Sequence, residues 1–396
     1  MLPLAITAFT ATTALGPGLQ AQSHGLAASR SGLRRNDFSH APLDTWIGRV
    51  DGLEDVPLPA DAGEWECRNN RLAWLAMNQD GFADAVRQAA QRHGSERVAV
   101  VMGTSTASIG ATELAYRTLT EGGVFPKALQ RRAVHQPNSL TGFVQAVLGL
   151  QGPALTIATA CSSSAKVFAA AERLIRLGVV DAAVVGGVDT LCESVLFGFN
   201  SLELVSSEPC RPFDVTRGGI SIGEAGGFAL LERREVAPHA PRLAGYGESS
   251  DAHHMSTPHP EGLGAELALR DALARAGLDA SEVDYINLHG TASLKNDEVE
   301  AALVARSFRA ETRASSTKGF TGHTLGAAGI VEAAYALLAI RDGFIPGNLN
   351  ASQPDPACGP QMAWHNEHQP VRVALSNSFG FGGNNACLAF VAGERA

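Results

Sequence analysis

The sequence has few charged and few aromatic residues. Of its 396 residues 18% are charged, against about 25% in an average protein, and 6% are aromatic. The 31 Lys and Arg against 40 Asp and Glu give a net charge of −9, which argues against a general nucleic-acid binder. No nucleic acid is therefore expected as a partner. The apolar share of 45% is enough for a large core, which excludes a mainly disordered chain.

Long apolar runs and closely spaced cysteines are also missing. No run approaches the ~18 apolar residues of a membrane helix, so no membrane span is expected. The first 22 residues lack a basic start, and threonines interrupt their apolar stretch, which favours a strand and a Gly-Pro-Gly turn over a secretory signal. The six cysteines have irregular spacings without a C-x-x-C pair. They indicate reduced thiols and a cytoplasmic location rather than disulfides or a zinc site.

Short apolar runs alternate with alanine-rich stretches of helical periodicity. In the first half, strands are predicted at 97–102, 154–159 and 182–188, and helices at 139–148 and 163–177. In the second half, strands are predicted at 283–289, 371–377 and 386–391, and helices at 265–276 and 329–340. This alternation predicts a layered α/β fold with a largely parallel sheet. The proline-rich segment 238–241 predicts a boundary between two similar halves, residues 1–240 and 241–396.

Cys161 lies where a predicted strand meets a predicted helix, in Thr159-Ala160-Cys161-Ser162-Ser163-Ser164. The first turn of a helix has unpaired N–H groups and a partial positive charge, which favour a thiolate over a thiol. A thiolate attacks carbonyls and thioesters, and the N–H of Cys161 could help to hold an oxyanion. A buried cysteine before a serine-capped helix explains the segment equally well.

Two histidines occupy loops near predicted strands. His289 begins His-Gly-Thr-Ala-Ser at the carboxyl end of a strand, where α/β folds place ligands, although a histidine bonded to loop backbone is the simpler interpretation. His323 lies in a segment rich in Gly and Thr, five residues after Lys318. The small residues suit either close approach of a substrate or tight helix–sheet packing, and their order is not that of a phosphate-binding loop. One Cys and two His together form a common acyl-transfer set.

A glycine- and phenylalanine-rich turn at 377–385 completes the pattern. With it, the sequence resembles the elongating β-ketoacyl-acyl carrier protein synthases of the thiolase superfamily, in the family's order from Ile6 to Leu388. The matching stretches are the Cys161 turn, Arg211–Asp214, Ser250–Met255, His289–Thr291, Lys318–Gly329 and Phe379–Asn384. This resemblance implies a thiolase-like fold, with two related βαβ halves in α/β/α/β/α layers.

The resemblance also implies the roles of individual residues. Cys161 would carry the acyl group as a thioester, and His289 and His323 would stabilise the enolate formed when malonyl-carrier protein loses carbon dioxide. The amides of Cys161 and Phe381 would form the oxyanion hole, with Phe381 also the gating aromatic. Lys318 would be a structural and electrostatic lysine. The supporting residues would be Glu332, Phe379, Gly380 and Thr291.

The same resemblance gives expectations about cofactors and partners. Loss of carbon dioxide supplies the carbanion, so neither a metal nor an organic cofactor is expected, and phosphopantetheine arrives on the carrier protein. The partners would be acyl- and malonyl-loaded acyl carrier protein, and either a second copy of the chain or a ketosynthase-like subunit. Carrier docking is assigned to a set of basic residues, because opposite charges steer encounter. The set is Arg68, Arg71, Lys127, Arg131 and Arg132.

Some residues depart from the family pattern. Gly218 and Ile220 follow Arg217 where the family usually has Asp and Phe, and Ala292-Ser293-Leu294 replaces the usual sequence after Thr291. These changes suggest a specialised branch rather than the housekeeping fatty-acid enzyme, and one similar to the ketosynthases of bacterial aryl-polyene pathways. The expected reaction is decarboxylative condensation of malonyl-carrier protein with the acyl group on Cys161, in the elongation of a fatty acid or of a polyene or polyketide chain. A non-catalytic chain-length partner subunit and a degradative thiolase are the alternatives. The first normally lacks the nucleophilic Cys, and the second needs a Cys near the C-terminus with Gly two residues on, which Cys387 does not have.

Overall fold

The computed structural model describes residues 1–394, and ten strands of this part form one mixed sheet. They are β1 (Leu4–Thr12), β4 (Val98–Gly103), β5 (Ala154–Ile157), β6 (Ala182–Asp189), β8 (Ala225–Arg233), β9 (Arg242–Ser250), β10 (Tyr285–Asn287), β11 (Arg313–Ser315), β14 (Val373–Gly380) and β15 (Asn384–Val391). Their order is β11-β10-β14-β15-β9-β1-β8-β6-β4-β5. Shorter strands are β2 (Arg34–Arg35), β3 (Trp46–Gly48), β7 (Ile222–Gly223), β12 (Phe344–Ile345) and β13 (Glu367–His368).

The large sheet consists of two halves with the same topology. Strands β1 and β9 meet through the pairs Leu4–Leu243 and Ala5–Arg242, so the two halves join only at the ends of these strands. Outward from this junction, each half has two antiparallel pairs and then two parallel pairs. The prediction of a largely parallel sheet is wrong for this reason. Residues 238–241 lie between β8 and β9, and the division into two domains there stays a prediction.

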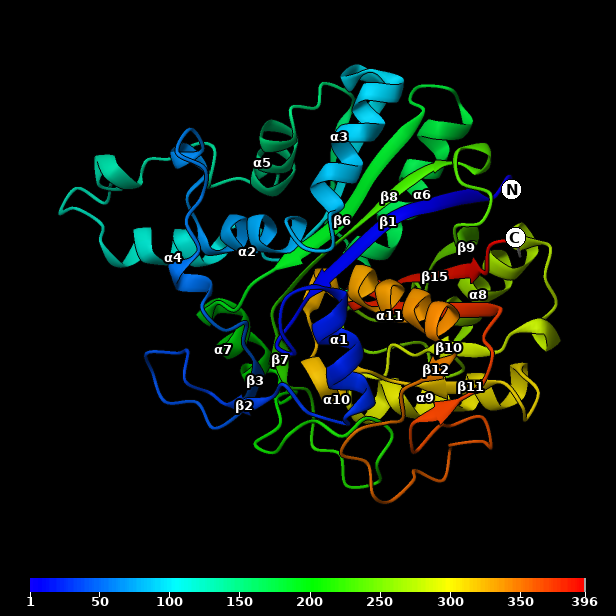
Figure 1. The fold of residues 1–396 in the computed structure, drawn as a ribbon. Helices are drawn as coiled ribbons and strands as arrows, with labels where there is room; N and C mark the ends of the chain where they lie inside the picture. The colour runs from blue at the N-terminus through cyan, green and yellow to red at the C-terminus, as the bar shows by residue number, and fades with distance from the viewer. Residues whose placement is uncertain (395–396) are drawn as a thin grey trace.

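Helices cover both sheet halves and fill the space between them. They are α1 (Gly18–Ala27), α2 (Arg68–Met77), α3 (Phe82–His93), α4 (Ile109–Arg117), α5 (Ser139–Leu148), α6 (Ser163–Arg176), α7 (Glu193–Ser201), α8 (Leu263–Ala276), α9 (Leu294–Ser307), α10 (Lys318–Thr321) and α11 (Ala328–Asp342). Helices α6 and α11 pack between the sheet halves (Figure 1), α2, α3 and α5 cover one outer face, and α8 and α9 cover the other. This confirms the predicted α/β/α/β/α layers.

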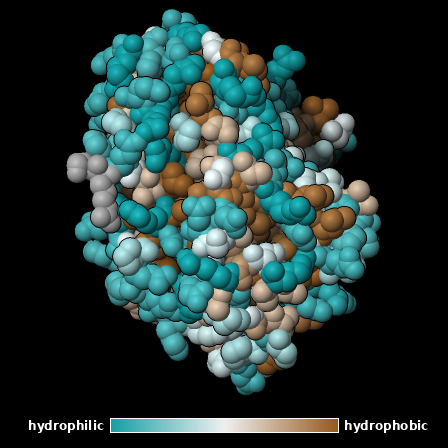
Figure 2. Space-filling view, turned by 90° about the vertical axis from the view of Figure 1, so that its right-hand side faces the viewer, coloured by the Kyte–Doolittle hydropathy of each residue, from teal (hydrophilic) through white to brown (hydrophobic). Residues whose placement is uncertain are grey.

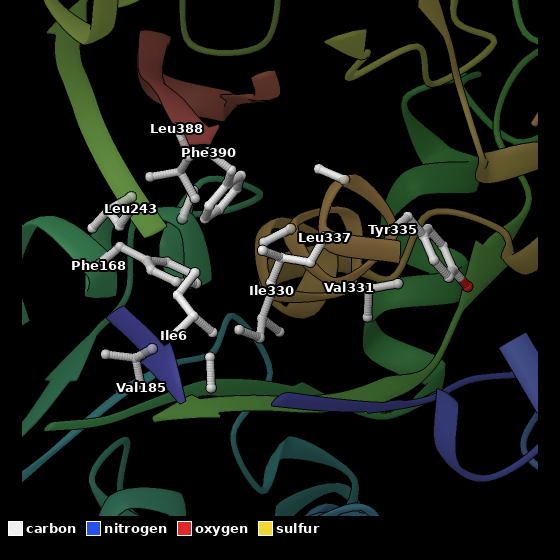
Figure 3. Packing of buried hydrophobic residues seen from close by; sticks show 14 of the residues in the cluster. Ile6, Phe168, Val185, Leu243, Ile330, Val331, Tyr335, Leu337, Leu388 and Phe390 are labelled. Carbon is white, nitrogen blue, oxygen red and sulfur yellow. The ribbon is translucent and has the colours of Figure 1, made fainter. Parts of the chain in front are cut away.

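The core between the sheet halves holds α6 and α11 in place. Phe168 of α6 contacts Phe390 of β15, with ring centroids 5.9 Å apart, and Ile330 of α11 lies in the same cluster (Figure 3). Val185 of β6 faces this cluster, whereas Val184 faces the cluster under α2, α3 and α5. A strand buried on both faces explains why its sequence is a continuous apolar run. Because the sheet is packed on both faces, the helices α6 and α11 between its halves are held in place. The candidate site lies at the starts of these two helices.

The surface is largely polar. Figure 2 shows hydrophilic residues over most of one face, with hydrophobic residues gathered across its middle. Among residues 1–394, no helix combines the length and the apolar character needed to span a bilayer. The cytoplasmic location stays a prediction.

Candidate active site

Cys161 lies on a tight turn between β5 and α6. Ala160, just before it, has a φ of 52°, a left-handed conformation that is strained for a residue with a Cβ. The hydroxyl of Ser163 donates to the carbonyl of Ala160 at 2.6 Å and so holds the turn. The turn also packs closely on β4, where a Cβ on Gly103 would lie 2.4 Å from the backbone N of Ser164. The Cys161 thiol is therefore rigidly placed at the start of α6.

The structure brings Cys161, His289 and His323 together. The Nε2 atom of His323 lies 3.0 Å from the Sγ of Cys161, and the two imidazole rings have centroids 5.4 Å apart at an angle of 87°. Potential ligand atoms of the three residues all lie within 4.8 Å of one another. Such a spacing could hold a metal ion. The Nδ1 atoms of both histidines, however, have no partner among the described residues, whereas metal-bound histidines are usually oriented by a bond at the other nitrogen.

Lys318 and Glu332 form a buried ion pair beside the histidines. The ammonium of Lys318 contacts a carboxylate oxygen of Glu332 and donates to the carbonyl of His289. Burial raises the pKa of Glu332 to about 7, an effect that Lys318 opposes. Burial, reinforced by the charge of Lys318, lowers the pKa of His289 and His323 well below the ordinary value. Both imidazoles are therefore neutral at physiological pH.

The protonation state of the Cys161 thiol differs from the one expected from the sequence. Burial raises its pKa to about 11, which outweighs the charge of Lys318 and the backbone N–H of Phe381, both of which lower the pKa. The prediction of a resting thiolate is therefore wrong, because desolvation of the sulfur exceeds the effect of the helix start. The resting site holds a neutral thiol that faces the neutral imidazole of His323. A nucleophile arises when the thiol proton moves to that imidazole.

A cavity with a volume of about 430 Å³ leads to these side chains. Phe381 lies in its wall and packs against Phe199 of α7, with ring centroids 5.5 Å apart. Phe379 packs against His289, with ring centroids 5.8 Å apart, and Phe379, Gly380 and Thr291 all line the cavity. The predicted supporting residues other than Glu332 thus lie in the wall of this one cavity.

Most of the residues that depart from the family pattern line the same cavity, namely Gly218, Ile220, Ser293 and Leu294, whereas Ala292 is not part of its lining. Gly218, Gly219 and Ile220 form part of its wall. Gly219 has a φ of +127°, and a Cβ on it would lie 2.3 Å from the carbonyl oxygen of Leu204, so this position requires glycine. The smaller and aliphatic side chains at 218 and 220 leave the cavity free of an aromatic ring at this point of the wall.

Glu300, which the sequence analysis did not single out, supports the His289 loop. Its carboxylate accepts hydrogen bonds from the backbone N–H of His289 at 2.9 Å and of Gly290 at 2.8 Å, and from the amide of Asn377 at 3.2 Å. Burial raises the pKa of Glu300 to about 7. In the sequence, Glu300 can be recognised only as an acidic residue more than one helical turn into α9, on the helix face that hydrophobic periodicity predicts to be buried.

The predicted docking residues lie outside the cavity lining, and two of them, Arg71 and Arg131, contact Glu66. Arg71 forms an ion pair with the carboxylate of Glu66 at 2.5 Å, and Arg131 donates to its carbonyl at 2.6 Å. Arg68, in the same helix as Arg71, is held by the buried carboxylate of Glu224. The remaining two, which are exposed, are Lys127 and Arg132.

Three histidines lie in the loop between β9 and α8. In the part of the chain that the structure describes, His253, His254 and His259 belong to no group of three potential ligands. The rings of His253 and His259 pack against each other with centroids 5.3 Å apart.

A thiol that shares its proton with an imidazole is the chemical basis of acyl transfer, and the doubled layered fold is that of thiolase-like enzymes. Two family models match the chain: the N-terminal domain of β-ketoacyl synthases over residues 68–237, and their C-terminal domain over residues 241–352. The chain belongs to the β-ketoacyl synthase family, and it is an acyltransferase of that type.

Relatives agree with this membership. The mitochondrial 3-oxoacyl-[acyl-carrier-protein] synthase of Arabidopsis thaliana is 40% identical, in a match that covers 64% of this chain and 59% of that protein. Nodulation protein E of Rhizobium sp. (strain N33) is 35% identical over 82% of each chain. The ketosynthase ApeO of Xenorhabdus doucetiae, solved in complex with its chain length factor ApeC, is 37% identical. Its structure superposes with a TM-score of 0.89 and covers 99% of this chain and 98% of that one.

Proposed function

We propose that this enzyme extends an acyl chain bound to Cys161 with two carbons from malonyl-carrier protein. The observation that carries the proposal is the 3.0 Å contact between the Cys161 thiol and His323, with His289 beside them at the end of the cavity. The first step transfers the acyl group. Cys161 gives its proton to His323 and attacks the thioester carbonyl, the C–S bond to the carrier breaks, and the proton passes to the departing thiolate. The amides of Cys161 and Phe381 hold the oxyanion.

The second step consumes malonyl-carrier protein. The malonyl carboxylate leaves as carbon dioxide, and its bonding electrons form an enolate whose oxygen accepts hydrogen bonds from His289 and His323. Neutral imidazoles suit this role, because each has one N–H to donate toward the developing charge; in His323 this proton lies on Nε2 at this step, whereas the same nitrogen is unprotonated when it accepts the thiol proton in the first step. The enolate carbon attacks the acyl thioester, the bond to Sγ breaks, and the thiolate takes up a proton from solution. Burial, reinforced by the charge of Lys318, keeps both imidazoles neutral. No metal or organic cofactor enters this sequence.

The partner that delivers both substrates is an acyl carrier protein, as the name of the Arabidopsis relative suggests. Carrier proteins are acidic, and the basic residues of α2 and of the segment 127–132 offer a positive surface in a chain of net charge −9. Arg68, Arg71 and Arg131 are already bonded within the protein, so we assign the long-range attraction mainly to Lys127 and Arg132.

A second ketosynthase-like chain covers the apolar surface of α4. Large apolar side chains are exposed there in the single chain, which is unusual for a free surface. They are Ile109, Leu114, Tyr116, Leu119 and Val124. Strand β5 is the neighbouring sheet edge, and Leu155 on it is 42% exposed. The similarity to ApeO, which was solved with a chain length factor, favours a heterodimer over a homodimer.

The acyl group we propose is a conjugated polyene chain. Support comes from the similarity to ApeO and from the cavity, whose wall lacks an aromatic ring at 218–220 and offers the faces of Phe199 and Phe381. The test is chain extension with a panel of carrier proteins loaded with saturated or polyenoic chains, together with malonyl-carrier protein. β-Ketoacyl-carrier protein formed faster from polyenoic chains supports the proposal, and preference for saturated chains refutes the polyene substrate. No extension of any chain would favour a non-catalytic role, and equal use of coenzyme A esters would favour a thiolase.

A further inference from the structure

Asp189 is a buried carboxylate that the reaction steps above do not use. It ends β6, and its side chain is fully buried. Five donors surround it: the hydroxyls of Thr104 and Thr106 at 2.5 and 2.7 Å, and the backbone N–H groups of Ser105, Thr106 and Gly326 at 2.9, 2.8 and 2.6 Å. So many donors to one carboxylate fix its position and orientation.

These donors connect Asp189 to both turns of the site. Gly326 follows His323 by three residues, so the carboxylate holds the turn that presents the imidazole. On the other side, the hydroxyl of Ser105 donates to the carbonyl of Ala160 at 3.1 Å, directly before Cys161. The contact is close, because a Cβ on Gly326 would lie 2.6 Å from the Ser105 Oγ and 2.7 Å from an Asp189 oxygen.

Both turns are strained and need such support. Ala160 has a φ of 52° and Leu325 a φ of 57°, left-handed conformations that persist in residues with a Cβ only when neighbours enforce them. The first residue precedes Cys161, and the second follows His323 by two positions. Replacing Asp189 removes a link between these two turns, which lie far apart in the sequence.

We propose that Asp189 is a positioning residue that sets the 3.0 Å contact between the Cys161 thiol and His323. The inference rests on the proposed roles of these two residues and adds a third that touches neither. It is tested by the reactivity of the thiol itself. The rate at which iodoacetamide alkylates Cys161 depends on how readily its proton leaves to His323.

The variant Asp189→Asn distinguishes a positioning role of Asp189 from an effect of its charge, because the two change the reactivity of the Cys161 thiol in opposite directions. The negative charge of Asp189 raises the pKa of Cys161, so removing the charge alone makes the thiol more reactive at pH 7. Losing the alignment between the Cys161 thiol and His323 makes the thiol less reactive. We expect alkylation of Cys161 at pH 7 to be at least about tenfold slower than in the unchanged protein, with the difference shrinking as the pH approaches 10, where the thiol begins to ionise unaided.

Two further variants keep the test decisive. Ser105→Ala removes only the link to Ala160 and keeps the charge, so its rate at pH 7 falls in the same direction by a smaller factor. If Asp189→Asn does not fold, the alkylation rate of Ser105→Ala alone tests the proposal. Glu232→Gln is the matched control, since Glu232 is also a fully buried carboxylate, and it accepts from the hydroxyl of Thr7 and from Arg92, neither of which belongs to the two turns. It contacts neither turn, and its alkylation profile stays that of the unchanged protein.

The readout is peptide-resolved mass spectrometry between pH 6 and pH 10, beside the melting temperature. A faster reaction at pH 7 in Asp189→Asn, or an unchanged profile with a lower melting temperature, overturns the proposal. An unchanged profile in Ser105→Ala does so as well when the first variant does not fold. No substrate is needed, so the result does not depend on the acyl chain or the carrier. Alkylation at cysteines other than Cys161 would instead count against the proposed nucleophile.

Discussion

Replacement of Lys318 by Met removes the cation from a fully buried ion pair. Glu332 then remains buried without its counter-charge, so at pH 8 it either carries an uncompensated charge or takes up a proton when the chain folds, and both destabilise the folded protein. Removing one partner of a buried pair costs about 3–5 kcal/mol in the free energy of unfolding. Without Lys318, which lowers the pKa of Glu332, that pKa rises further. The carboxyl is therefore protonated at pH 6, and the loss of stability is smaller there than at pH 8.

Urea unfolding at pH 6 and pH 8 measures this effect. The double variant Lys318→Met/Glu332→Gln leaves no charge in the site, so we expect it to regain most of the stability lost at pH 8. Arg87→Met is the matched control, since Arg87 pairs with Asp84 on the surface of α3 and contributes at most about 1 kcal/mol at either pH. Equal stability of the single and double variants at pH 8 would refute the buried ion pair as the source of the effect.

Three further predictions concern catalysis and docking. Cys161→Ala abolishes chain extension, and any extension that survives in product analysis contradicts the nucleophile. His289→Ala or His323→Ala slows release of labelled carbon dioxide from malonyl-carrier protein by at least about tenfold, since an oxyanion donor is lost; a normal rate argues against enolate stabilisation. Reversing Lys127 and Arg132 to Glu weakens carrier binding several-fold at low salt and less at high salt, and an unchanged affinity at low salt moves the docking surface elsewhere.

Much of the fold could be predicted because its signals are local. The helix predicted at 139–148 has the observed bounds of α5, and the helix predicted at 163–177 ends one residue beyond α6. Both have apolar periodicity and a glycine at or near their ends, features that depend on nearby residues only. The strand predicted at 283–289 is longer than β10, because apolar residues continue past the three positions that pair with neighbouring strands.

Strand direction was not predictable in the same way. Strand β8 was missed, and with it the antiparallel pairs that it forms with β1 and β6. Its sequence, Ala225–Arg233, begins with Ala and two Gly, which have low strand propensity, and burial against β1 and β6 outweighs that preference. Alternation of hydrophobic residues reveals a strand, but its partner and direction depend on tertiary packing.

The site shows the same division between local and tertiary information. Cys161, His289 and His323 follow recognisable motifs, so the sequence identified them. Glu300 and Asp189 have no motif, because their importance comes from the backbone N–H groups of distant turns that fold around them. The charge state of Cys161 was mispredicted for a related reason. The helix start is visible in the sequence, whereas the burial that raises the pKa of the thiol is not.

The central claim is that Cys161 carries the growing chain. Incubation with acyl-carrier protein, without malonyl-carrier protein, followed by peptide-resolved mass spectrometry, tests it most directly. We expect one acyl group per active chain on the peptide that contains Cys161, removed when malonyl-carrier protein is added. An acyl group on a different residue, or none on a folded protein offered the full panel of chains, would contradict it.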